Sequence, residues 1–193
     1  MDRDVTDPSS LRERKKVQTR RRIHRAALEL AIAQGPSGVT IDDIAEAAEI
    51  SPRTFFNYFA TKDQAFIGLG SDICDEVTAA LHARPATESI IDSVHAVFAA
   101  RFAVLVEDVE SWRLRQKLAG MAPELANAMF GTTARMERAA VTVAVERAGH
   151  DDLDVVLPAF QAMSAIRAAL WEHASAGLTG DLLERLDEAF KRL

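Results

Sequence analysis

The sequence predicts an all-α fold of about nine helices, in which an N-terminal three-helix domain is followed by a larger helical bundle. Composition supports this, because 48% of the 193 residues are hydrophobic while only 6 are proline and 9 are glycine. Apolar residues recur at steps of three and four along most of the chain, the spacing of a helix face that packs on a core. Most of these segments begin at Ser, Thr or Asp, and several end at Gly, as capped helices do.

The first predicted helix is strongly basic. Residues 1–10 carry charge, proline and serine without a periodic apolar face, and they predict a flexible tail. The helix is expected from about Leu11 or Arg14 to Gln34, because Gly35 followed by Pro36 would stop it. The basic residues of its N-terminal half, opposed only by Glu13, are Arg12, Arg14, Lys15, Lys16, Arg20, Arg21, Arg22 and Arg25.

Residues 40–62 predict two short helices separated by a tight turn. Thr40 caps the first, with Asp43 in the acidic position of a capping box, and Ser51 with Pro52 starts the second. A break of about three residues makes the helices cross steeply, which is the helix-turn-helix arrangement. Phe55 and Phe59 share the face expected to pack inward. The remaining arc, mostly side chains that hydrogen-bond bases and phosphates, consists of Pro52, Arg53, Thr54, Asn57 and Tyr58.

The net charge of −6 argues against nucleic-acid binding until its distribution is considered. Residues 1–63 contain 11 Lys or Arg and 10 Asp or Glu, so the totals of 23 and 29 leave 12 and 19 for residues 64–193. An acidic body with one basic end presents a single surface to the phosphates of DNA. A basic run alone is more often a solvated face, and the adjacent helix-turn-helix is what favours phosphate contact here.

Residues 14–66 resemble the DNA-binding domain of the TetR family of bacterial transcriptional regulators. The sequence departs from the family pattern at Glu49, where glycine is usual, and at Phe55 and Phe56, where Leu-Tyr is usual. The family's tyrosine at that place often touches a phosphate, a hydrogen bond that Phe56 cannot donate. The positions that match the pattern are Gly35, Thr40, Ile44, Ala45, Ala48, Ser51, Thr54, Tyr58, Phe59, Thr61 and Lys62.

This resemblance implies a DNA-binding domain over residues 11–63 that contacts double-stranded operator DNA. Lys62 is expected at a phosphate because it lies in the first turn of the following helix. Thr19 matches a position of the first helix that often contacts the backbone in the family. The candidate DNA contacts are Thr19, Arg20, Thr40, Ser51, Pro52, Arg53, Thr54, Asn57, Tyr58 and Lys62.

Residues 64–193 are predicted to form a second, entirely helical domain. One long helix is expected from Thr61 to about Ala83, with Gln64 completing a capping box and Pro85 ending the segment. The other segments with helical periodicity are 87–106, 111–118, 123–147, 151–177 and 181–193.

Nothing in the sequence indicates catalysis, so we expect no enzymatic activity, no metal and no cofactor. The five histidines are scattered without metal-ligand spacing, and no nucleotide-binding or hydrolase motif occurs. The lack of an apolar run of roughly 18 residues, and of a signal-peptide core, predicts a cytoplasmic protein without a membrane partner.

For the second domain the resemblance implies a small-molecule effector pocket and a homodimer. The homodimer is expected through the last two helices, so that two recognition helices reach the half-sites of a palindromic operator. An aromatic and methionine lining would suit an apolar or amphipathic effector, although side chains of these types more often fill a core, and their spacing does not distinguish the two. The candidate effector-binding residues are Phe98, Phe102, Trp112, Met121, Phe130, Met163, Arg167 and Trp171.

The favoured function is ligand-responsive transcriptional regulation, most simply repression. One alternative is a small-molecule-binding helical protein whose N-terminal domain no longer regulates transcription, for which Phe56 is the only indication. A second alternative is an enzyme of the ferritin-like type. It would need inward-facing carboxylate and histidine pairs, and the sequence does not have that spacing.

Overall fold

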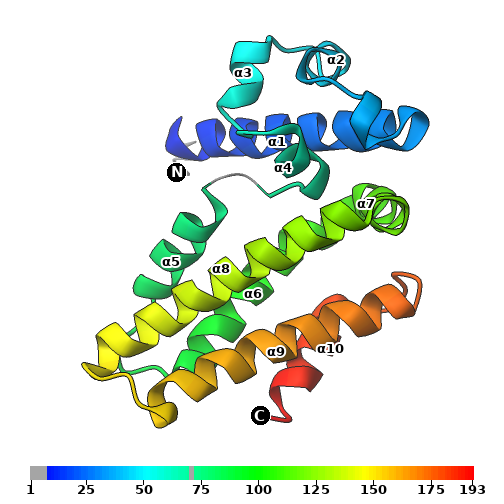
Figure 1. The fold of residues 1–193 in the computed structure, drawn as a ribbon. Helices are drawn as coiled ribbons and strands as arrows, with labels where there is room; N and C mark the ends of the chain where they lie inside the picture. The colour runs from blue at the N-terminus through cyan, green and yellow to red at the C-terminus, as the bar shows by residue number, and fades with distance from the viewer. Residues whose placement is uncertain (1–7, 70–71) are drawn as a thin grey trace, which may run out of the picture. The chain divides into compact units, whose positions relative to one another are not determined.

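The computed structural model describes residues 8–69 and 72–193, and the side chains of all of these except 8–14, 123–124 and 126–130. Regular structure in these ranges is helical throughout, as predicted. The chain divides into two compact units, one of residues 1–71 with Lys117–Leu125 and the other of Asp72–Gln116 with Ala126–Leu193. Figure 1 labels their helices in chain order. The domain boundary expected at residues 63–64 stays a prediction.

The first unit is built on the long helix α1 (Pro8–Gln34), which contacts the 3₁₀ turn η1 (Pro36–Gly38), α2 (Ile41–Ala47) and α4 (Lys62–Ile67). The helix begins within the segment expected to be a tail, and residues 1–7 lie outside the described residues. It ends where predicted, at Gly35, which has a φ of +80°. The short α3 (Pro52–Phe56) packs on α2. Fully buried apolar side chains of this unit include Ile23, Ala27, Leu28, Ile44, Phe55, Phe59 and Phe66.

The single helix predicted from Thr61 to Ala83 is wrong, because the chain forms α4 and then α5 (Ile73–His82) instead. Gly68 ends α4 with a φ of +79°, in the left-handed region. The buried His24 lies against this position and donates its Nδ1–H to the carbonyl of Ala65 at 2.6 Å. Apolar periodicity continues across the break, so the pattern alone did not reveal it.

Replacing Gly68 with alanine is expected to destabilise the first unit by about 1–3 kcal/mol. A Cβ at this residue would lie 2.8 Å from Cε1 and Nε2 of His24, and the left-handed φ adds strain for any L side chain. The measurement is the free energy of unfolding from urea titration. Gly38→Ala is the matched control, since its Cβ would meet only Gln34 Cβ at 3.7 Å. Equal stability of the two variants would contradict the role given to Gly68.

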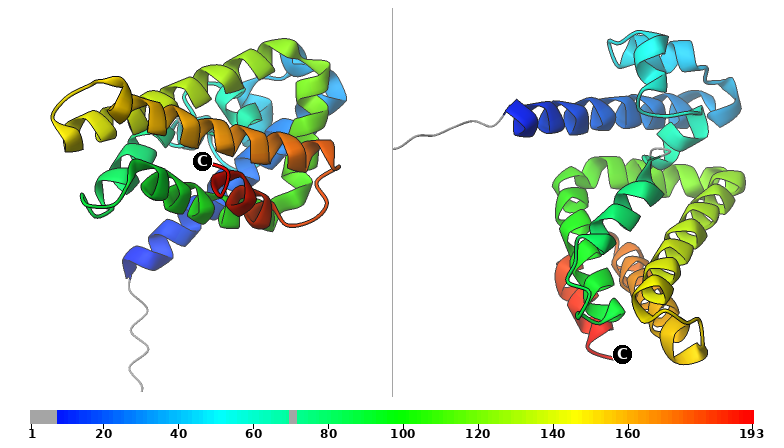
Figure 2. Two further views of the ribbon diagram at one scale, coloured as in Figure 1. Left: turned by 90° about the horizontal axis from the view of Figure 1, so that it is seen from below. Right: turned by 90° about the vertical axis from the view of Figure 1, so that its left-hand side faces the viewer.

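In the second unit, α9 (Leu153–Ser175) packs on α6 (Ile90–Leu105) and on α10 (Leu182–Phe190), and α10 also packs on α6. Figure 2 shows these three helices side by side. This unit also contains α5 and the turn η2 (Val106–Asp108). It includes α7 (Val109–Met121) as far as Gln116 and α8 (Pro123–Ala148) from Ala126 onward. Buried apolar residues of this unit include Val77, Leu81, Val94, Phe98, Phe102, Val143, Met163, Ile166, Leu182 and Leu186.

Some helix boundaries in this unit differ from the predicted ones. The start predicted at Thr87 is wrong, because Ser89 caps α6 by accepting the N–H of Asp92 at 3.0 Å. α7 continues through Gly120, beyond the end predicted at residue 118. Asp152 and Asp181 cap α9 and α10.

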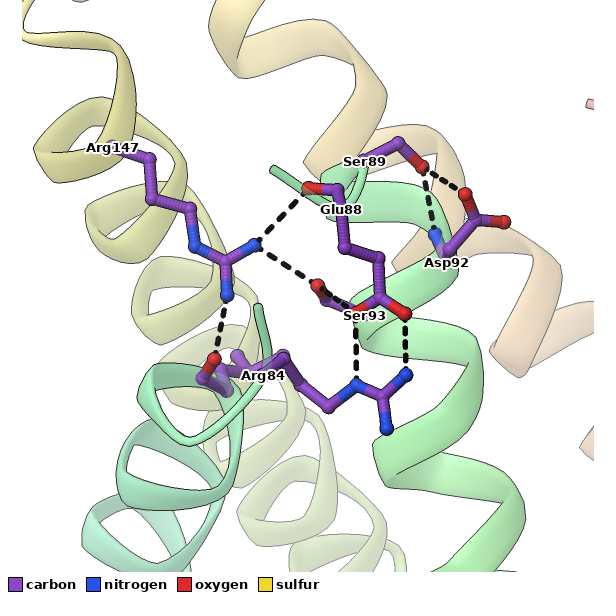
Figure 3. Close-up of polar contacts among 7 residues, drawn as sticks. Arg84, Glu88, Ser89, Asp92, Ser93 and Arg147 are labelled. Carbon is purple, nitrogen blue, oxygen red and sulfur yellow. Dashed lines mark hydrogen bonds and ion pairs between the residues drawn. The ribbon is translucent and has the colours of Figure 1, made fainter. Parts of the chain in front are cut away.

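A polar network joins the C-terminal end of α5 to α6 and α8 (Figure 3). Arg147 donates from Nη2 to the carbonyl of Leu81 at 2.6 Å and from Nη1 to the hydroxyl of Ser93 at 2.9 Å. Glu88 accepts from Nε of Arg84 at 2.8 Å and from the Ser93 hydroxyl at 2.7 Å. Because the last carbonyls of a helix lack partners within it, Arg147 caps α5 from a neighbouring helix.

Acid is expected to weaken this network. The hydrogen bonds from Arg84, and then Ser93, lower the pKa of Glu88 from 4.5 to about 2. A depressed carboxyl pKa stabilises the folded state above the unfolded pKa of 4.5, and this contribution is lost as pH falls toward 2.

The stability difference between wild type and Glu88→Gln should therefore be larger at pH 7 than at pH 3, as measured by urea unfolding. Glu110→Gln is the control, because that exposed carboxylate lies 4.0 Å from its partner Arg113. A difference that does not change with pH would contradict the assignment.

Candidate nucleic-acid interface

The helix-turn-helix is held at its start by the predicted capping box. Thr40 Oγ1 accepts the N–H of Asp43 at 3.1 Å, and Asp43 Oδ2 accepts the N–H of Thr40 at 2.8 Å. The Thr40 hydroxyl and then its backbone N–H lower the pKa of the Asp43 carboxyl. In the turn, Glu49 has a φ of +52°, the conformation that glycine adopts without strain.

The recognition helix α3 is short, and its N-cap and its buried side chains hold it in place. Ser51 Oγ accepts the N–H of Thr54 at 3.1 Å, and Pro52 occupies the first helical position, so both predicted start signals are confirmed. Phe55 and Phe59 are fully buried, with ring centroids 6.0 Å apart. Their burial fixes which side of α3 faces outward.

The outward side of α3 consists of Arg53, Phe56 and Asn57, all exposed and spaced i, i+3 and i+4. Thr54 and Tyr58 were predicted to face outward with Arg53 and Asn57, but both are half-buried. The hydroxyl of Thr54 also lies 2.9 Å from the hydroxyl of the capping serine. The predicted residues Thr40, Ser51 and Pro52 are exposed.

Phe56 was not among the predicted contacts because its side chain cannot donate a hydrogen bond to a phosphate. Its side chain is 55% exposed, and its ring meets that of Phe55 edge to face, with centroids 5.6 Å apart and planes at 89°. The spacing in the sequence indicates that Phe56 shares the outward face of the helix, since it follows Arg53 by three residues and precedes Asn57 by one.

Lys62 has a structural role that the sequence did not reveal. Its ammonium donates to the carbonyls of Pro36 and Val39, each at 2.9 Å, and the side chain is partly buried. These bonds hold the segment between α1 and α2 against the start of α4. Phosphate contact by Lys62 stays a prediction.

The candidate DNA contacts and basic residues of α1 differ in their exposure to solvent. Thr19 and Arg20 are both partly exposed, as a contact to the DNA backbone would require. Arg25 is exposed and forms an ion pair with Glu29 at 2.9 Å. The side chains at positions 12 and 14 lie outside the described residues.

Four of the candidate effector residues are buried in the core of the second unit. Phe98 and Phe102 lie on α6 with ring centroids 6.2 Å apart, nearly perpendicular. Trp112 lies 5.0 Å from the ring of the buried His173, and Met163 is buried on α9. The structure brings these four into the interior without distinguishing a pocket lining from core packing.

The other four candidates lie elsewhere. Arg167 is exposed, and its Nη1 forms an ion pair with Glu137 Oε2 at 2.6 Å. Trp171 and Met121 are also exposed. The side chain of Phe130 lies outside the described residues. Of the candidates whose side chains are described, four are buried and three are exposed.

Two cavities of the second unit have other linings. The larger, about 890 Å³, is an open groove over α9 and α10 that includes Phe160, Ala168 and Arg185. The smaller, about 390 Å³, is lined by Glu88, Arg147 and neighbouring residues of α6 and α9. Within the described ranges, no group of three His, Cys, Asp or Glu side chains is placed to hold a metal ion.

Comparison with known proteins agrees with this geometry. Residues 23–67 match the family model for bacterial regulatory proteins of the tetR family, and residues 88–193 match the MftR C-terminal domain. The HTH-type transcriptional regulator TcmR of Streptomyces glaucescens is 41% identical over 98 residues. These residues are 51% of this chain and 43% of TcmR, so the chain spans less than half the length of that relative.

Solved structures similar to this chain include two FadR regulators. A transcriptional regulator FadR from Bacillus subtilis in complex with stearoyl-CoA matches with a TM-score of 0.49 and 17% identity, over 88% of this chain and 95% of that one. Thermus thermophilus FadR in complex with lauroyl-CoA matches with a TM-score of 0.47 and 22% identity, over 89% and 91% of the two chains.

The two family models together identify the protein. The C-terminal model alone covers more than half of the chain, and the N-terminal model covers the capped helix pair described above. The family is one of DNA-binding regulators without enzymatic activity. This chain belongs to the TetR family of bacterial transcriptional regulators.

Proposed function

We propose that this protein is a cytoplasmic, ligand-responsive repressor that binds a palindromic operator as a homodimer and is released by a small apolar or amphipathic effector. The observation that carries the DNA-binding part is the outward face of α3. There Arg53, Phe56 and Asn57 are exposed at helical spacing on a helix fixed by buried Phe55 and Phe59. Guanidinium and amide groups are the side chains that hydrogen-bond guanine and adenine edges in the major groove.

The homodimer is supported by an exposed apolar stripe on α9. Leu153, Leu157, Phe160 and Trp171 are 74%, 49%, 43% and 73% exposed, respectively. Ser164 and Ala168 complete the stripe, so its members follow at steps of four, three, four, four and three, which is one helix face. A large apolar face left open on a monomer marks an interaction site.

The occupant favoured for this stripe is the same stripe of a second copy. A two-fold interface places identical patches opposite one another, and small residues in the middle let the helices approach closely. The groove over α9 and α10 belongs to the same surface. Leu182 and Leu186 of α10 are buried within one protomer, so they are not part of this exposed surface.

α9 also has the length and composition of a membrane-crossing helix, with a mean hydropathy of 1.3 over its most apolar 18-residue window. A third of that window is buried within the structure, and core helices pass the same test. The stripe itself contains Ser164 and is flanked by Gln161 and Arg167, which are exposed polar groups. Pairing of protein surfaces accommodates such groups better than lipid does.

Release by an effector would follow from a population shift. An effector that binds one shape of the second unit more tightly favours that shape, and the linked change in spacing of the two recognition helices lowers operator affinity. The interior of the second unit, which contains the buried Phe98, Phe102 and Trp112, is the region we propose for the effector. It would have to open for a ligand to enter.

Operator binding and repression test this proposal together. Duplexes selected from a random pool by the purified protein serve as the operator in a mobility-shift titration. Affinity should fall by about 10³–10⁵ between 50 and 200 mM salt if roughly six to ten phosphates are contacted. The same operator placed within a promoter should lower reporter expression in cells that make the protein. Selection of no operator, or unchanged expression, would overturn the proposal.

A further inference from the structure

We propose that Phe56 is a specificity-determining residue that recognises one thymine in each operator half-site through the thymine methyl group. This inference rests on the proposed DNA-binding function and adds a base preference to it. The phenyl group lies between Arg53 and Asn57 on the outward face of α3, so whatever base edges those two residues reach, Phe56 meets the same groove.

The ring is both exposed and held in place. At 55% exposure it leaves apolar surface in water, which the free protein gains nothing from. Its edge-to-face contact with the fully buried Phe55, at 5.6 Å and 89°, restricts the ring without covering it. A preorganised apolar group loses little side-chain entropy when a partner covers it.

The chemistry of the phenyl group indicates which part of the DNA Phe56 contacts. Phe56 has no hydrogen-bonding group, so it gains nothing from a phosphate oxygen or from the donors and acceptors of base edges. The major groove offers one exposed apolar group, the C5-methyl of thymine, and phenylalanine is among the side chains that contact it. Covering that methyl removes apolar surface of both partners from water, which favours A·T over G·C at this position.

The polar groups around the ring agree with this assignment. The hydroxyl of Thr54 is already bonded at the helix cap, and Tyr58 is half-buried, so neither competes for the same place in the groove. Arg53 and Asn57 flank the ring and supply the hydrogen bonds that set its register on the DNA.

A double-mutant cycle between protein and DNA tests the proposal. Each thymine of the selected operator is replaced in turn, in both half-sites, by deoxyuridine, which lacks only the methyl group. For wild type, one symmetric pair should weaken binding by about fourfold per half-site, or about fifteenfold together, because burial of one methyl-sized group is worth about 0.8 kcal/mol. Phe56→Ala should bind the thymine and deoxyuridine operators equally.

Controls separate this contact from other losses. Arg53→Ala should bind both operators more weakly but keep the ratio between them, because it leaves the ring in place. Phe56→Leu, which keeps an apolar side chain, should retain part of the ratio. Circular dichroism and thermal unfolding of each variant establish that the helix-turn-helix is folded.

The following results would overturn the proposal. If no thymine shows a methyl effect, or if Phe56→Ala keeps the same ratio as wild type, Phe56 does not recognise thymine, while operator binding itself stands. A Phe56→Ala variant that weakens binding to both operators by the same factor keeps the wild-type ratio, which would mean that the ring packs on sugar and not on the methyl group. If the protein selects no operator at all, the proposed function fails and this inference fails with it.

Discussion

Replacing Arg53 and Asn57 together by alanine is expected to lower operator affinity by at least about a hundredfold. Each side chain is exposed on the outward face of α3, and each good contact to a base edge is worth about 1–3 kcal/mol. Because two copies bind one operator, every substitution removes a contact from both half-sites. The measurement is a mobility-shift titration on the selected operator at fixed salt.

The matched control is Arg113→Ala with Gln116→Ala. These are also an exposed arginine and an exposed amide, but they lie on α7 of the second unit. The control should bind as wild type does, and both double variants should keep the helical circular dichroism of wild type. Unchanged binding by the Arg53 and Asn57 variant would show that another surface contacts the DNA.

Introducing charge into the α9 stripe should convert the protein to a monomer and lower operator affinity by more than about a hundredfold. Leu157→Glu with Phe160→Glu would place two pairs of like charges at the two-fold interface. Burying a carboxylate there without a partner of opposite charge costs free energy. A monomer contacts only one half-site, so the loss of affinity follows from the loss of the second. Sedimentation gives the mass, and the mobility shift gives the affinity.

Val104→Glu is the matched control, since Val104 is also an exposed large apolar residue but lies on α6 outside the stripe. It should leave both the mass and the operator affinity unchanged. A dimer that survives the double substitution would place the interface elsewhere on the chain. A folded monomer that still binds the full operator with wild-type affinity would contradict the need for two copies.

The sequence predicted the first unit well where local chemistry decides the structure. The capping box at Thr40, the start at Ser51 and Pro52, and the inward direction of Phe55 and Phe59 all depend on residues within four positions of one another. Glu49, at the position where the family usually has glycine, adopts the left-handed conformation.

Predictions failed where a distant residue decides. The break at Gly68 depends on His24, and the bonds of Lys62 depend on Pro36 and Val39, more than twenty residues away in sequence. The capping of α5 by Arg147 is a further case, because the two partners are 66 residues apart. Periodicity describes one helix face at a time and carries no information on such contacts.

The predicted site residues differ from those that the structure presents for another reason. Phe56 was left out of the predicted contacts because it cannot hydrogen-bond, yet the structure leaves it exposed beside Arg53 and Asn57. In the second unit, aromatic and methionine residues were selected by type, and the structure distributes them between the core and the surface. Residue type indicates which side chains suit an apolar ligand, but only the fold shows which of them meet.

The most direct test of the account is DNA cleavage from a reagent tethered beside α3. Cys74 is the only cysteine, so Cys74→Ser with Ala60→Cys leaves one thiol at an exposed position three residues beyond Asn57, to which iron-EDTA can be attached. The account predicts two cleavage clusters on the operator, related by two-fold symmetry and with the strand offset of a major-groove source. Attachment at Ala100→Cys on α6 should give none. A single cluster, or the offset of a minor-groove source, would contradict it.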